Sequence, residues 1–180
     1  MKIRAILSII IILTVILFVI YQYMLYQKYA SRPMPTALHS KVEEASQQLI
    51  TKAEETGITV VITDGFRSVD EQNSIYAQGR QTEGNIVTYA RGGESYHNYG
   101  LAIDFALQNK QGGIIWDLQY DGNENGNSDW MEVVKIAKSL GFKWGGDFTR
   151  FKDYPHLQMD FGLSIHELKR GKRPRDVIDL

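Results

Sequence analysis

Cysteine is absent from this chain of 180 residues. Its absence excludes disulfide bonds, thiolate metal ligands and anchoring through a lipidated cysteine. Any metal site must therefore use histidine, carboxylate or other oxygen ligands.

The chain also lacks an excess of basic charge. Its first 32 residues hold four of the 20 basic residues and none of the 21 acidic ones, so residues 33–180 carry a formal charge of −5. This balance argues against nucleic acid as a partner. The length leaves room for one domain and little more, and we expect a monomer.

Long apolar runs are missing except at the amino terminus. Residues 5–20 carry no charge, and Ser8 and Thr14 are the only polar side chains among them. About 20 helical residues cross the ~30 Å hydrocarbon core of a bilayer, and the tyrosines that follow this run suit the membrane–water interface. We therefore expect residues 1–27 to be a single-pass membrane anchor, with the rest of the chain outside the cell membrane.

A cleaved signal peptide is the competing interpretation, because Lys2 and Arg4 form a positively charged start. The protein would then be secreted. However, the apolar stretch is longer than a usual signal peptide requires, and no clear Ala-x-Ala site precedes Ser31. Residues 28–37, which include two prolines, are expected to link this segment to a domain over residues 38–180.

Apolar periodicity and turn residues predict short helices and strands in this domain. The expected helices cover residues 38–56, 69–78, 130–140 and 164–169, and the expected strands cover residues 58–62, 86–90, 101–107, 114–116 and 142–144. Ser68 with Glu71 fits a capping box at one helix start. Pro155 suits a sheet edge or the start of a further strand.

His97 and Asp104 flank a bend at Gly100 that leads into an apolar segment. Imidazole and carboxylate both bind zinc, and a catalytic zinc takes three protein ligands and leaves one position for water. His156 is the candidate third ligand, and Asp153 is the candidate base for that water. A structural hydrogen bond between His97 and Asp104 is the alternative, and two histidines with one carboxylate also suit iron.

Arg67 is expected between the end of a strand and the start of a helix. A guanidinium there could stabilise an oxyanion or bind a substrate carboxylate, whereas the ordinary alternative is an ion pair with Asp64 or Asp70. Further candidates for substrate contact are Gln72, Ser95, Tyr96 and Trp144.

Residues 121–132 match the calcium-loop pattern D-x-[DN]-x-[DN]-G-x5-E. The candidate oxygen donors are Asp121, Asn123, Asn125, Asn127, Asp129 and Glu132, and Gly126 occupies the sharp turn. The alternative is an ion-free turn before a helix whose capping box is Asp129 with Glu132. A bound calcium ion would have a structural role.

Three motifs together resemble one protein family. They are Gly65-Phe66-Arg67-Ser68, the pattern SxHxxGxAxD over residues 95–104, and DxPH over residues 153–156. These motifs resemble the zinc peptidases of the D-alanyl-D-alanine carboxypeptidase and L-alanyl-D-glutamate endopeptidase family, which cut bacterial cell-wall peptides. The phrases FRSxxEQNxxYAQGR and ARGGxSYHNYGLAIDFAL look especially like the L-alanyl-D-glutamate branch.

The resemblance implies an α+β fold, in which helices flank a small central antiparallel sheet as in hedgehog and DD-peptidase domains. It implies one zinc ion held by His97, Asp104 and His156, with Asp153 as the base and Arg67 binding the oxyanion. The expected activity is cleavage of the L-Ala–D-Glu bond in peptidoglycan stem peptides. One alternative is a D-Ala-D-Ala carboxypeptidase or dipeptidase; a second is a non-catalytic wall-binding domain, which would not require Asp153.

Overall fold

The computed structural model describes residues 2–30 and 32–175. The helices are α1 (Lys2–Ala30), α2 (Ser40–Glu54), α3 (Val69–Ala77), α4 (Asp129–Ser139) and α5 (Ile165–Lys169), with short 3-10 helices η1 (Tyr96–Tyr99) and η2 (Gly145–Asp147). The strands are β1 (Thr59–Asp64), β2 (Ala102–Gln108), β3 (Ile114–Ile115), β4 (Lys143–Trp144) and β5 (His156–Gln158).

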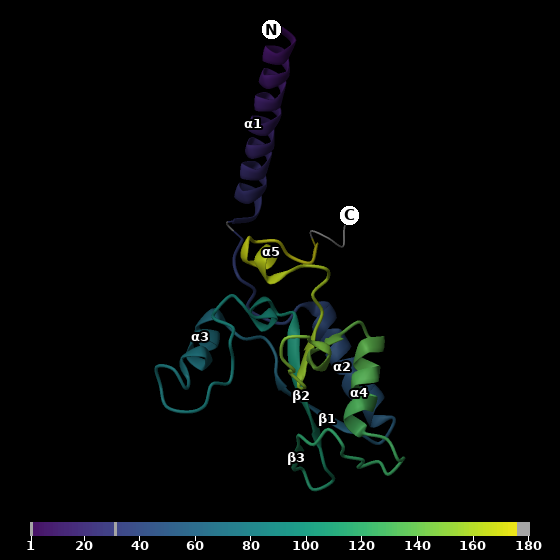
Figure 1. The fold of residues 1–180 in the computed structure, drawn as a ribbon. Helices are drawn as coiled ribbons and strands as arrows, with labels where there is room; N and C mark the ends of the chain where they lie inside the picture. The colour runs from purple at the N-terminus through teal and green to yellow at the C-terminus, as the bar shows by residue number, and fades with distance from the viewer. Residues whose placement is uncertain (1, 31, 176–180) are drawn as a thin grey trace.

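Helix α1 extends away from the rest of the chain (Figure 1). Its segment Ile6–Ala30 has a hydropathy of 2.6, and its most apolar stretch is not buried against protein. By length and composition this helix can cross a membrane, a property that anchors and signal sequences share. Helix α1 continues through residue 28, the expected start of the linker, to Ala30, and the boundary between anchor and linker stays a prediction. No proline or glycine interrupts the chain before Pro33.

The strands form one sheet with the order β1-β2-β5-β4, and β3 also pairs with β2. All these pairs are antiparallel. The predicted α+β fold with a small central antiparallel sheet is therefore confirmed. Pro155 lies at the start of β5, where its carbonyl accepts the Phe105 N–H. Its missing N–H removes no hydrogen bond from within the strand.

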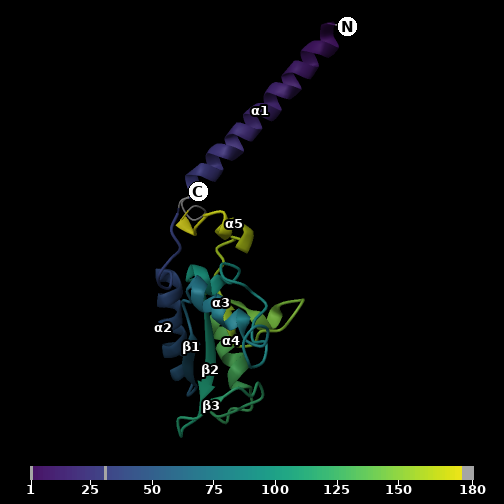
Figure 2. The ribbon, with the colours of Figure 1, turned by 90° about the vertical axis from the view of Figure 1, so that its left-hand side faces the viewer.

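The hydrophobic core joins the sheet to α2 and α4, which lie on the opposite side of the strands from α3 (Figures 1 and 2). Leu49 of α2, Phe105 of β2 and Trp130 of α4 are buried there, and the rings of Phe105 and Trp130 lie 4.6 Å apart. Burial of each such side chain contributes roughly 1.5–3 kcal/mol. Because neighbouring strand residues point to opposite faces, this packing directs Asp104 away from the core.

The connection between α3 and η1 differs from the expected one. The capping box of Ser68 and Glu71 is present at the start of α3, but residues 86–90 do not form the expected strand. Side chains donate hydrogen bonds to backbone carbonyls that would otherwise bond a neighbouring strand. Gln72 donates to Ala90 O at 2.8 Å, and Arg80 donates to Thr88 O at 3.0 Å. The segment is therefore tied to α3 instead of the sheet.

Candidate metal centre

Three separate elements bring His97, Asp104 and His156 together. His97 lies in η1, which ends at Gly100 in the left-handed conformation with φ 65°. A Cβ at Gly100 would also crowd the backbone of Leu38, so this turn requires glycine. Asp104 of β2 is paired directly with His156 of β5 in the antiparallel register. Their side chains consequently project from the same face of the sheet.

The three ligand atoms form a nearly equilateral triangle. His97 Nε2 lies 3.3 Å from Asp104 Oδ1, His156 Nδ1 lies 3.3 Å from the same oxygen, and the two nitrogens are 3.2 Å apart. Ligands at about 2.0–2.1 Å from a tetrahedral zinc ion are separated by about 3.3 Å. Asp104 Oδ1 is buried and has no hydrogen bond of good geometry. The donor set and its spacing therefore fit a zinc ion.

Hydrogen bonds orient both imidazoles for metal binding. His97 Nδ1 lies 2.7 Å from the carbonyl oxygen of Gly65, and His156 Nε2 lies 3.0 Å from Oε1 of Gln158. Because these oxygens accept, each of these nitrogens carries the proton, and the opposite nitrogen directs its lone pair into the space between the two imidazoles and Asp104 Oδ1. The sequence did not identify either hydrogen-bond partner. Gln158 could have been found, because residues two apart in a strand lie on the same face, as Gln158 and His156 do here.

Asp104 and the two imidazoles stabilise one another's charged forms in the absence of a metal ion. Burial acts to raise the pKa of Asp104, but the imidazoles of His156 and His97 outweigh it and hold that pKa well below its usual range. For His156, burial acts to lower the pKa, whereas the Asp104 carboxylate raises it overall. Asp104 is thus ionised at neutral pH, as a metal-binding carboxylate must be.

Gln158 provides the first test of this arrangement. The substitution Gln158→Leu removes the acceptor that orients His156, so we expect zinc affinity to fall by about 10–100-fold. Gln158→Glu keeps an acceptor oxygen and should bind zinc more tightly than the leucine variant. Competition with a chromogenic chelator measures both constants. Unchanged zinc affinity in Gln158→Leu would contradict the orienting role.

Arg67 lies beside the metal centre. Its Nη2 forms an ion pair with Asp64 and lies 3.9 Å from Asp104 Oδ2, and its Nη1 donates to Gln72 Oε1 at 2.9 Å. The ion pair expected as the ordinary alternative is therefore present with Asp64. It does not remove Arg67 from the site, because the same contacts hold the guanidinium next to Asp104.

Asp153 is half-buried just before β5, close enough to the centre for electrostatic interaction with His156, Asp104 and Arg67. Burial raises the pKa of its carboxyl group. The backbone holds Asp153 against η2, because its N–H donates to the carbonyl oxygen of Gly145 at 3.2 Å. This placement suits a proton acceptor at the edge of the metal site.

Gly145 packs closely against both Asp153 and His156. A Cβ at Gly145 would overlap the backbone oxygen of Asp153 and lie 3.0 Å from the Cβ atoms of Asp153 and His156. We expect Gly145→Ala to lower zinc affinity and activity and, because overpacking costs about 1–3 kcal/mol, to lower the Tm by roughly 2–12 °C. Differential scanning calorimetry and zinc titration measure these effects. Gly65→Ala is the control, because its Cβ would meet Leu38 at an ordinary 3.6 Å; equal effects of the two changes would contradict the prediction.

Two of the four candidates for substrate contact are buried, and their contact with substrate stays a prediction. Gln72 is 0% exposed and bonds Arg67 and Ala90, and Trp144 is buried with its Nε1 donating to Tyr154 O. Ser95 and Tyr96 are only partly buried. Ser95 caps η1, and the Tyr96 hydroxyl donates to a backbone carbonyl, so their contact with substrate stays a prediction.

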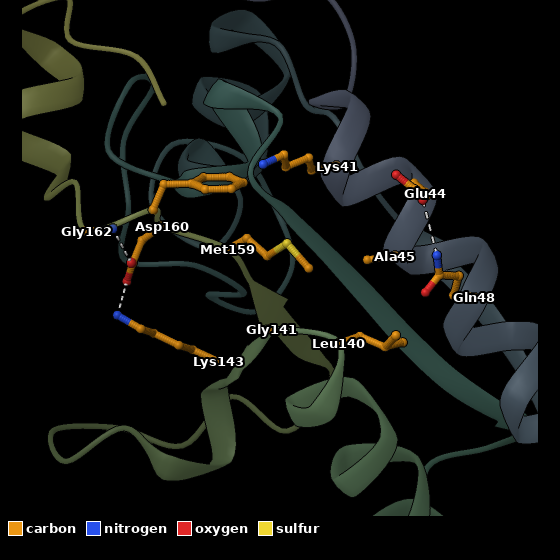
Figure 3. A pocket seen from close by; sticks show the side chains of 11 residues that line it. Lys41, Glu44, Ala45, Gln48, Leu140, Gly141, Lys143, Met159, Asp160 and Gly162 are labelled. Atoms are coloured by element: carbon orange, nitrogen blue, oxygen red, sulfur yellow. Dashed lines mark hydrogen bonds and ion pairs between the residues drawn. The ribbon is translucent and has the colours of Figure 1, made fainter. Parts of the chain in front are cut away.

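A pocket of about 580 Å³ lies elsewhere, between α2 and the chain around β4 and β5. Its lining residues are Lys41, Glu44, Ala45, Gln48, Leu140, Gly141, Lys143, Met159, Asp160, Phe161 and Gly162. Figure 3 shows Asp160 in this lining, bonded to Lys143 and to the Gly162 amide. None of the three metal-site residues lines this pocket, so it is separate from the metal centre.

The expected calcium loop leads into α4. The Asp121 carboxylate accepts the N–H groups of Asn125 and Gly126 at 3.1 and 2.9 Å. The predicted capping box of Asp129 and Glu132 is wrong, because α4 begins at Asp129 and the hydroxyl of Ser128 caps it. Among the histidine, aspartate and glutamate side chains of residues 2–30 and 32–175, only His97, Asp104 and His156 bring three ligand atoms within 4.8 Å of one another. Calcium binding by the loop stays a prediction.

Comparison with known proteins identifies the family. A family model described as D-alanyl-D-alanine carboxypeptidase matches residues 88–159, which include all three candidate ligands and Asp153. The peptidoglycan L-alanyl-D-glutamate endopeptidase CwlK of Bacillus subtilis (strain 168) is 67% identical over 127 residues, covering 71% of this chain and 76% of CwlK. The chain belongs to this peptidase family.

Three further proteins resemble this chain at lower sequence identity. The L-alanyl-D-glutamate peptidase of Listeria phage A118 is 32% identical over 125 residues, covering 69% of this chain and 38% of the phage protein. The L,D-carboxypeptidase DacB from Streptococcus pneumoniae has a TM-score of 0.51 at 20% identity, covering 74% of this chain and 77% of DacB. The LD-carboxypeptidase LdcB has a TM-score of 0.50 at 21% identity, covering 76% of this chain and 70% of LdcB. These two structures support the fold.

Proposed function

We propose that this protein is a zinc-dependent peptidoglycan hydrolase that cleaves the L-Ala–D-Glu bond of cell-wall stem peptides. The 67% identity to an endopeptidase of that name supports the reaction. The observation that carries the chemistry is the convergence of His97, Asp104 and His156 with the spacing of zinc ligands. No other metal-ligating group of this kind occurs among the described residues.

The residues around the three ligands transfer the proton and stabilise the oxyanion. Bound zinc would polarise the scissile carbonyl and lower the pKa of water from about 15.7 towards roughly 7. Asp153 accepts a proton from the attacking water and passes it to the leaving amine. Because burial raises its pKa, Asp153 is a stronger base than an exposed aspartate. Arg67 stabilises the oxyanion, and loss of such a donor costs on the order of 10²–10³ in rate.

The substrate places the domain on the outer side of the cell membrane. In this proposal α1 is an uncleaved anchor, residues up to 37 form the linker, and residues 38–180 form a monomeric peptidase unit. An anchored enzyme remains close to the wall of its own cell. If α1 is instead a cleaved signal sequence, the same domain is secreted.

A D-alanyl-D-alanine carboxypeptidase is the second candidate, because the matching family model carries that description. The zinc chemistry is the same in both reactions, and only the position of the bound peptide differs. The position of Asp153 beside the ligands argues against a domain that only binds the wall, since binding alone requires no base.

Mass spectrometry of stem peptides separates these functions. The full-length protein in detergent is incubated with peptidoglycan, with added zinc or with a chelator. New chain ends at L-Ala and D-Glu that the chelator suppresses are the expected result. Loss of terminal D-Ala would assign the carboxypeptidase, and no cleavage by zinc-loaded protein would leave the wall-binding domain.

A further inference from the structure

The loop that leads into α4 contains a buried carboxylate oxygen without a partner. Asp129 is 2% exposed, and its Oδ2 accepts the Gly122 N–H at 2.9 Å, so the side chain points into the loop. Its Oδ1 is buried and has no hydrogen-bond partner. Burial of an ionised carboxylate oxygen is costly unless a hydrogen-bond donor or a cation meets it.

The sequence of this loop contains acidic residues but no basic ones. Between residues 112 and 134 the sequence contains no lysine, arginine or histidine, but it contains the acidic residues Asp117, Asp121, Glu124, Asp129 and Glu132. Over the described ranges 2–30 and 32–175, none of these five carboxylates takes part in an ion pair. The buried oxygen therefore lies in a region of uncompensated negative charge.

Other candidate ligand residues of the loop already form hydrogen bonds with one another. The amide of Asn125 donates to both carboxylate oxygens of Glu132 at 3.1 and 2.9 Å, and the amide of Asn123 donates to the same carboxylate at 3.3 Å. The backbone N–H of Asn125 donates to Asp121 at 3.1 Å. A 180° rotation of a side-chain amide exchanges its nitrogen and oxygen. After this rotation, the amide oxygens of Asn123 and Asn125 would lie next to the Glu132 carboxylate.

We propose that this loop is a calcium site, in which the buried oxygen of Asp129 and the carboxylates of Asp121 and Glu132 bind one ion. The amide oxygens of Asn123 and Asn125 and the backbone carbonyl of position 127 complete the coordination. Six or more oxygen donors in a flexible loop suit calcium better than magnesium, which requires a small octahedral site and retains water.

The ion would stabilise the start of α4, the helix that packs against the sheet carrying Asp104 and His156. α4 begins at Asp129, and the next residue, Trp130, packs against Phe105 in β2. Calcium binding would therefore stabilise the packing of α4 against the sheet. It should raise the unfolding temperature without entering the chemistry at His97, Asp104 and His156.

Calorimetry of the zinc-loaded, full-length protein in detergent tests this site with calcium chloride as the probe. Two neutral amide donors and an extracellular setting suggest a Kd of about 10⁻⁴ M. At about 10 mM calcium, near 100 times that Kd, we expect the Tm to rise by roughly 5–10 °C. Equal concentrations of magnesium should produce a much smaller shift.

Variants locate the ion. Glu132→Gln and Asp121→Asn should each abolish most of the calcium-dependent rise, and either change leaves the buried Asp129 in place. Glu124→Gln is the matched control, because it removes an exposed loop carboxylate that is not a ligand. A wild-type Tm that calcium does not change, or a full rise in Glu132→Gln, would overturn the proposal. His97→Ala should retain the calcium effect, which separates this site from the zinc centre.

Discussion

The substitution Asp153→Asn should reduce kcat by about 10²–10⁴-fold, the usual contribution of a general base. Asparagine has nearly the same size but cannot accept the proton of the attacking water. Asp153 interacts electrostatically with His156 and Asp104 without being one of the three converging ligands. The zinc content should therefore stay at the wild-type level. Initial rates of stem-peptide cleavage and elemental analysis of the same samples measure the two effects.

Asp147→Asn is the matched control for this prediction. Asp147 lies in the neighbouring η2 but is exposed and paired with Lys138 at 2.7 Å. Its loss should leave the rate close to that of the wild type. If Asp153→Asn lost zinc as well as activity, Asp153 would be a ligand and not the base. If it kept the wild-type rate, another group would have to accept the proton.

Replacement of His97 by alanine should abolish both zinc binding and hydrolysis. The change removes one corner of the ligand triangle, in which the atoms lie 3.2–3.3 Å apart. The fall in zinc affinity should exceed the about 10–100-fold expected when a residue that only orients a ligand is lost. Elemental analysis after dialysis gives the zinc content, and stem-peptide cleavage gives the residual rate.

His166→Ala provides the corresponding control, since His166 is exposed on α5. It should retain zinc and activity. A His97→Ala variant that kept one tightly bound zinc ion would show that the metal lies elsewhere. A variant that lost activity but kept zinc would assign His97 to the substrate instead of the metal.

The metal centre was predictable because its residues lie at places that local patterns reveal. Gly100 indicated the turn, the apolar residues after it indicated β2, and Pro155 indicated the start of β5. The direct pairing of Asp104 with His156 was not predictable from spacing, because strand register depends on contacts distant in the sequence. Gln158 and the Gly65 carbonyl were missed for the same reason, since both become partners of the ligands only when the sheet forms.

Two predictions of local structure failed for physical reasons. Residues 86–90 have a composition that suits a strand, but Gln72 of α3 and Arg80 donate hydrogen bonds to their backbone carbonyls instead. At Asp129, the preceding Ser128 took the capping position. Tertiary contacts decided the first case and a neighbouring residue decided the second, each between two locally acceptable arrangements.

Titration of zinc into metal-free, full-length protein, with bound zinc and cleavage rate measured in each sample, tests the central claim most directly. The proposed centre predicts that new L-Ala and D-Glu ends appear in proportion to bound zinc and reach a maximum at one ion per chain. The Asp153→Asn variant should follow the same binding curve with little cleavage. Hydrolysis by metal-free protein, or zinc bound at one ion per chain without any cleavage, would contradict it.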